Sequence, residues 1–281
     1  MRQINTAMLC LLGTLAVTAC EKAGSDGETA LKNVNVIDQT NLNDIMLTVA
    51  DPEEAVTYFQ RATRQEPERL DLQRGLGKSL IRAKRATEGA VVWKRVSNHE
   101  NATDADQVAY ADALIRTGAW SDAEKILDSV PPTFENFDRY RLEAMIADSN
   151  KEWEKADSFY ETAVGLTTRP ANVLNNWGYS KLARGDFADA EQLFGEAITY
   201  DPSLFTAKNN MVLARGAQKN YTLPIIRVTQ IERAQLLHTM ALAAIKQGDI
   251  DTGKTLLEQA IETHPQFFEA AVNSLAKLET T

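Results

Sequence analysis

Small residues recur along this chain at an almost constant spacing. Ala55, Gly89, Ala123, Ala156 and Ala190 lie 34, 34, 33 and 34 residues apart. A bulky apolar residue follows each of them by four positions, and a smaller apolar residue follows by seven. This spacing places the three side chains on one face of an α-helix, so the pattern predicts a series of similar amphipathic helices.

A period of this length has room for two helices and a turn in every repeat. The clearest copy covers residues 171–204, with Gly178 on its first helix and Ala190 on its second. Small side chains at these two places let the helix backbones approach closely, while aromatic side chains fill the remaining volume. We therefore expect Phe187 and Phe194 in the core between the two helices. The four tryptophans also fall on positions that we expect to pack rather than to bind a ligand: Trp93, Trp120, Trp153 and Trp177.

Extending the register gives an all-α fold of about seven helix-turn-helix repeats, some of them degenerate. We expect N-caps at Asp51 and Ser121, each before a second helix. A C-terminal capping helix, Glu269 to Leu278, follows the last repeat. The repeats cover residues 36–69, 70–103, 104–136, 137–170, 171–204, 205–233 and 234–267.

The sixth repeat departs from the pattern. Pro224 stands where the other repeats have a small residue, and the repeat is five residues short. We expect its second helix to be damaged, with residues 223–228 extended, and Thr229 with Glu232 to form a capping box for the next helix. Two interpretations stay open: a shortened repeat packed against its neighbours, or a break that shapes a partner site.

The first residues of the chain are typical of an export signal. An apolar run from Ala7 to Ala19 is too short to cross a bilayer comfortably and ends in LAVTAC. This ending resembles the bacterial lipobox, in which cleavage precedes a cysteine that receives lipid. It implies a signal peptide over residues 1–19, lipidation at Cys20 and a polar tether over residues 20–35. The alternative is an ordinary secretory signal with a chance cysteine. Glu21, where a retention signal would have Asp, implies the periplasmic face of the outer membrane.

Composition and charge argue against several classes of function. The chain has 30 Lys and Arg against 39 Asp and Glu, a net charge of −9, which argues against nucleic-acid binding. Cys10 and Cys20 are the two cysteines, and the three histidines lie far apart. Catalytic and nucleotide-binding motifs are absent. We therefore predict a protein that is not an enzyme and uses no cofactor or metal, and its acidity favours partners with basic segments.

The repeat resembles the tetratricopeptide repeat (TPR), on the residues of 171–204 above all. The resemblance implies a right-handed superhelical TPR solenoid whose first helices line a groove. In that family an asparagine at the sixth repeat position often holds the backbone of an extended peptide. Asn176 and Asn210 fall at that position, and Asn172 and Tyr179 are expected to face the same groove. The alternative is that these four are ordinary helix-surface residues.

The combination of lipobox, tether and degenerate repeats resembles the TadD family of the tight-adherence (Flp) pilus system, most closely over residues 213–249. This resemblance implies an outer-membrane scaffold or pilotin-like factor. Its partners are then proteins or extended peptides, including the pilus secretin, with membrane attachment through the lipid. The alternative function is a lipoprotein scaffold for cell-wall enzymes or outer-membrane protein assembly.

Overall fold

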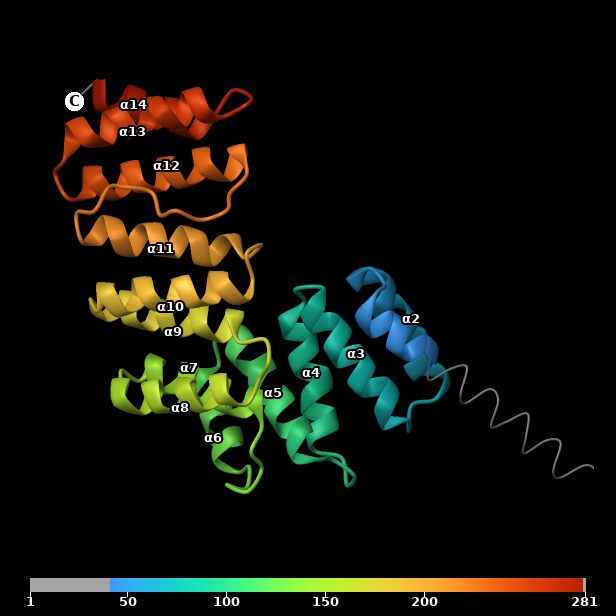
Figure 1. Cartoon of the computed structure of the whole chain (residues 1–281). Helices are drawn as coiled ribbons and strands as arrows, with labels where there is room; N and C mark the ends of the chain where they lie inside the picture. Colours follow the sequence, from blue (N-terminus) through green and yellow to red (C-terminus); the bar gives the residue numbers. More distant parts are fainter. Residues whose placement is uncertain (1–40, 280–281) are drawn as a thin grey trace, which may run out of the picture. The chain divides into compact units, whose positions relative to one another are not determined.

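The computed structural model describes residues 41–279, and the regular elements there are all α-helices (Figure 1). The predicted signal peptide, lipidated Cys20 and tether lie outside the described residues. None of the helices in this part of the chain is both long and apolar enough to cross a membrane. The chain divides into two compact units after Val92.

The first unit begins with a short helical stretch over residues 41–48. It continues with α2 (Pro52–Gln65) and α3 (Leu70–Arg82), and the division falls within α4 (Ala86–Ser97). The side chain of Phe59 on α2 is fully buried and packs over Gly75 of α3, where a larger residue would meet the ring.

The second unit is built from helices joined mostly by short turns. Four pairs of neighbouring helices pack extensively within the pair, as the helix-turn-helix prediction requires: α5/α6, α7/α8, α9/α10 and α12/α13. The bounds are α5 (Asp104–Arg116), α6 (Trp120–Asp128), α7 (Phe137–Ser149), α8 (Trp153–Gly165), α9 (Ala171–Arg184), α10 (Phe187–Tyr200), α11 (Phe205–Ala217), α12 (Gln230–Lys246), α13 (Ile250–Thr263) and α14 (Glu269–Glu279).

The small residues that recur in the repeats are buried where paired helices meet, as the sequence predicts. Ala156 and Ala190 are fully buried, and so is the ring of Phe194, which lies against Gly178 of the paired helix. The expectation for Phe187 is corrected: it is the first residue of α10 and is only half-buried. A residue at the end of a helix has fewer neighbouring side chains around it than one in the middle.

Two further expectations at helix starts had different outcomes. Asp51 caps α2 as predicted, because its Oδ1 accepts the backbone amides of Glu53 at 2.9 Å and Glu54 at 3.3 Å. The cap predicted at Ser121 is wrong. Helix α6 begins one residue earlier, at Trp120, so Ser121 already lies in its first turn and Ala119 is the N-cap. Trp120 is also exposed rather than packed in the core, since it opens the helix.

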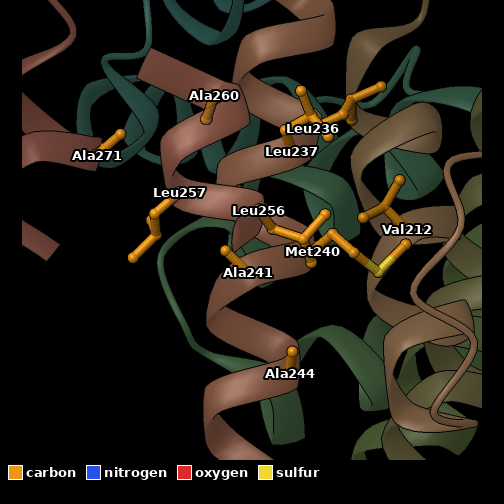
Figure 2. Close-up of a cluster of buried hydrophobic side chains, with 10 residues drawn as sticks. All are labelled: Val212, Leu236, Leu237, Met240, Ala241, Ala244, Leu256, Leu257, Ala260 and Ala271. Atoms are coloured by element: carbon orange, nitrogen blue, oxygen red, sulfur yellow. The ribbon is translucent and has the colours of Figure 1, made fainter. Parts of the chain in front are cut away.

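The sixth repeat lacks its second helix, as predicted. Residues 218–229, which we call the strap, run without helical structure from α11 to α12 (Figure 1). The capping box of Thr229 with Glu232 starts α12 as expected. Four strap side chains pack against the largest apolar cluster of this unit, part of which Figure 2 shows around Met240: Tyr221, Leu223, Ile226 and Val228. The strap thus supplies apolar cover that a second helix supplies in the other repeats.

Candidate partner-binding face

Three of the four predicted site residues lie on one face of α9. Asn172, Asn176 and Tyr179 follow an i, i+4, i+7 spacing, which brings them to one side of a helix. Asn172 is exposed, Asn176 is half-buried, and Tyr179 is 59% exposed. Their side chains make no hydrogen bond with any other part of residues 41–279, so their polar groups are available to a partner.

The fourth predicted residue, Asn210, is placed differently. Only 9% of it is exposed, and its Nδ2 donates a hydrogen bond of 3.1 Å to Oδ1 of Asn175 on α9. Asn210 therefore joins two neighbouring helices, whereas Asn176, at the same repeat position, stays unpaired. The repeat register aligns the two residues but does not reveal this difference, because it does not say which neighbouring side chain is within reach.

The bond of Asn210 is one rung of a polar ladder between helices. Thr239 of α12 donates to Oδ1 of Asn209 on α11 at 2.8 Å, and Nε2 of His238 lies 3.1 Å from Oγ of Ser274 on α14. Burial lowers the pKa of His238, which keeps the ring neutral near pH 7. We call these three pairs the polar ladder: Asn175 with Asn210, Asn209 with Thr239, and His238 with Ser274.

An apolar row runs beside the ladder. Tyr179 corresponds in the repeat register to Leu213 on α11 and, after the shortened repeat, to Leu242 on α12. Leu242 is 45% exposed and Leu213 half-buried. We call the polar ladder, this apolar row, Asn172 and Asn176 together the first-helix face. Sequence reasoning missed Leu213 and Leu242, although the same register that aligned the asparagines points to both.

Helix α9 is fixed against the neighbouring helix α8 by hydrogen bonds to one carboxylate. The carboxylate of Asp157 on α8 accepts hydrogen bonds from Nε1 of Trp177 at 2.6 Å, Nζ of Lys181 at 3.0 Å and the guanidinium of Arg184 at 2.6 Å. Burial alone would raise the pKa of Asp157, but these bonds, with Arg184 first, outweigh it and lower the pKa. The face on α9 is therefore presented by a fixed helix, which reduces the entropy lost on binding.

A second buried contact fixes α9 against α7. Asp148 accepts hydrogen bonds from the hydroxyl of Tyr160 at 2.7 Å and from Oγ of Ser180 at 2.5 Å. Burial raises the pKa of Asp148 despite these two bonds. Burial and the neighbouring carboxylate also raise the pKa of Tyr160 far above its usual value, so its hydroxyl stays protonated and donates.

Other parts of the described chain offer weaker candidates. A hollow of about 780 Å³ in the first unit is lined partly by Tyr58, Arg61 and Arg69. Arg69 is paired with Asp71 at 2.6 Å, so its charge is not directed at a ligand. Within residues 41–279, no three His, Cys, Asp or Glu side chains come together in a way that could hold a metal ion.

Comparison with known proteins agrees with the repeat architecture. Family models described as tetratricopeptide repeat match residues 47–93 and 236–266. No curated protein matches the sequence. Among solved structures, the Cut9–Hcn1 hetero-tetramer of the APC/C is similar with a TM-score of 0.60 and 13% identity, over 81% of this chain and 46% of that one.

Two further structures are similar at the level of the fold. The human IFIT1 dimer with PPP-AAAA has a TM-score of 0.56 and 15% identity, over 81% of this chain and 59% of that one. A tetratricopeptide repeat protein from Parabacteroides merdae has a TM-score of 0.53 and 12% identity, over 91% of this chain and 98% of that one. The chain thus spans about half the length of the first two structures.

The fold and the matches define a class of protein: an all-α array of helix-turn-helix repeats. Two segments match tetratricopeptide-repeat models, and the solved structures share the helical-repeat fold, so the fold predicted from the sequence is confirmed. TPR domains bind protein or peptide partners, and the first-helix face is the candidate surface for such a partner here.

Proposed function

We propose that this protein is a lipid-anchored TPR scaffold that binds an extended segment of a partner protein on the first-helix face. The observation that carries the proposal is the set of unpaired groups on α9, where Asn172, Asn176 and Tyr179 stand beside the fixed polar ladder.

The chemistry of the face suits an extended peptide. A carboxamide offers both a donor and an acceptor, which match the carbonyl and amide of one peptide group without reading its side chain. The exposed ring of Tyr179 and the side chain of Leu242 provide apolar contact for side chains of the peptide. Because the face carries no charged side chain, affinity depends on backbone bonds and apolar burial rather than on ion pairs.

In the cell, this scaffold acts as a pilotin-like factor in assembly of the Flp/Tad pilus, at the periplasmic face of the outer membrane. Support comes from the LAVTAC motif at Cys20, the degenerate repeats and the resemblance over residues 213–249. The pilus secretin is the partner that this role requires.

Crosslinking tests the binding face directly. A photoreactive residue in place of Tyr179, in cells that make the whole lipoprotein, should crosslink to the secretin. In a separate binding assay, a double variant with Asn172→Ala and Asn176→Ala should bind the purified secretin about fivefold to a hundredfold more weakly, at about 0.5–1.5 kcal/mol for each lost hydrogen bond. Gln259→Ala is the control, since it removes an exposed amide from the second helix α13.

The outcomes separate the alternatives. Crosslinks to cell-wall enzymes or to outer-membrane assembly proteins would replace the pilus role with that of another lipoprotein scaffold. Unchanged secretin binding by a stably folded double variant would rule out the first-helix face as the binding site.

The anchor has its own test. Cys20→Ala should abolish lipidation, because its thiol is the acceptor in the motif, while the repeats should fold unchanged. Mass spectrometry of the mature N-terminus measures this. An unmodified terminus at another residue in the native protein would contradict the anchor.

A further inference from the structure

Three neighbouring helices carry the first-helix face at a regular interval. Helix α11 contacts both α9 and α12, and the strap, rather than a second helix, joins α11 to α12 (Figure 1). A Cβ added at Gly216 of α11 would lie 2.5 Å from Cβ of Ala243 on α12, so these two helices approach closely. Helices that pack side by side have axes about 8–10 Å apart. Equivalent side chains of the three helices therefore recur at this interval across the face.

A row of uncharged polar residues accompanies the apolar row on all three helices. In the repeat register Asn172 corresponds to Thr206 on α11 and to Gln235 on α12. All three are exposed, and none of their side chains forms a hydrogen bond with another part of residues 41–279. The apolar row lies seven residues further along each helix, about two turns away. Each helix thus presents the same pair of features, one polar and one apolar.

Charged residues mark where this pattern stops. At the register position of Asn172, α7 has Asp138 and α14 has Glu269, and both are exposed. The polar and apolar rows on α9, α11 and α12 carry no charge between them. A charged side chain held against these rows would lose water without gaining a partner of opposite sign. The segment that fits the three helices is therefore uncharged along their width.

The interval between the helices selects the conformation of the bound segment. Two residues of a β-strand span about 6.6–6.8 Å, which is less than the helix interval of about 8–10 Å. Three residues of a strand span enough, but the third side chain then points to the opposite side. Three residues of a polyproline II helix span about 9.3 Å, and its period of three residues per turn brings every third side chain to the same side. Only the polyproline II helix sets one side chain on each of the three helices.

The polar groups of the face suit the same conformation. A polyproline II helix forms no internal hydrogen bonds, so its carbonyls are free to accept from the carboxamides of Asn172 and Gln235. The helix is already extended, so it loses less freedom on binding than a flexible chain does. At one end of the apolar row, the ring of Tyr179 is 59% exposed and offers a flat apolar surface to a proline or leucine side chain.

We propose that the first-helix face binds a polyproline II segment of the partner, with a large apolar residue at every third position in three successive places. These three side chains contact Tyr179, Leu213 and Leu242 in turn. This inference rests on the proposed function and adds to it the conformation of the bound segment and the spacing of its apolar residues.

Synthetic peptides test the spacing on the purified protein. The probe is a fluorescent peptide of three Leu-Pro-Gln units, and its isomer has the same composition with the leucines at every second position. In fluorescence anisotropy the isomer should bind about tenfold more weakly, since it sets fewer leucines on the row. Affinity should rise about tenfold with each added unit up to three, and a fourth unit should change it little, because the pattern ends after three helices.

Matched variants locate the site. Leu242→Ser should weaken binding of the three-unit probe about tenfold, to the affinity of the two-unit probe. Leu166→Ser is the control, because it changes an exposed leucine at the end of α8, away from the face, and should leave binding unchanged.

Several outcomes would overturn the proposal. Equal binding of the two isomers, or binding of neither while the secretin still binds, would refute the spacing. Tighter binding of the isomer, weakened by Asn172→Ala and Asn176→Ala, would refute the polyproline II conformation but leave the proposed function standing. Probe binding that none of these variants weakens would count against the first-helix face itself. A dimer that Leu242→Ser dissociates would show that a second copy covers the face instead.

Discussion

Gly178 tests how closely the paired helices of a repeat pack. It lies inside α9, where alanine would normally stabilise the helix by about 1 kcal/mol. A Cβ added there would lie 2.7 Å from Cε1 and 2.9 Å from Cδ1 of Phe194, closer than carbon atoms can approach. The ring is fully buried, so it cannot move aside into solvent.

Overpacking of a tight core costs about 1–3 kcal/mol, which is more than the gain in helix propensity. We therefore expect Gly178→Ala to lower the free energy of unfolding by about 1 kcal/mol, the difference between these effects. Gly195→Ala is the matched control, because its nearest contact would be Cε of Met211 at 3.9 Å, an ordinary distance. That variant should gain up to about 1 kcal/mol from helix propensity alone.

Urea denaturation followed by circular dichroism measures both variants, and hydrogen exchange locates the effect. Amides of α9 and α10 should exchange faster in Gly178→Ala, since a repeat contacts mainly its neighbours. Combining Gly178→Ala with Phe194→Leu should show a favourable coupling, because the smaller side chain makes room for the methyl group. If Gly178→Ala is as stable as Gly195→Ala, the close-packing argument is wrong.

Asp157→Asn should destabilise the protein at neutral pH by weakening its bonds to Lys181 and Arg184. The lowered pKa of Asp157 contributes stability above its usual value of 3.8, and this contribution is lost as the pH falls through the folded-state pKa. The free energy of unfolding of the variant should therefore fall less steeply with decreasing pH. Urea titrations at several pH values measure this, and the same pH dependence for both proteins would count against it. Tyr221→Phe should speed hydrogen exchange in the strap but not in α8, because it removes the hydroxyl that bonds to Asp249, and unchanged exchange would show that this bond does not hold the strap.

The repeat architecture was predictable because its signals are local and recur. Ala156 and Ala190 are fully buried at the expected positions, and Asp51 caps α2. The repeated small residues and the N-cap are recognised from residues within one or two helical turns of each other, and their spacing can be read directly from the sequence. Pro224 likewise predicted the strap, because proline disrupts a helix and the shortened repeat has too few residues for a second helix.

Helix ends were less predictable than helix interiors. Ser121 has the composition of a cap, and Phe187 has the register of a core residue, yet both are displaced by where their helices begin. A shift of one residue at a helix start changes which backbone groups need a cap and how many neighbours surround a side chain.

By itself, the sequence determined the helical repeats, their small-residue contacts and the interruption after α11. Only the tertiary structure decided that Asn210 bonds to Asn175 while Asn176 stays free. The physical reason is that a repeat register fixes the face on which a side chain lies. Whether that side chain reaches a neighbour or stays open to a partner depends on how adjacent helices rotate and approach, which packing across the whole stack determines.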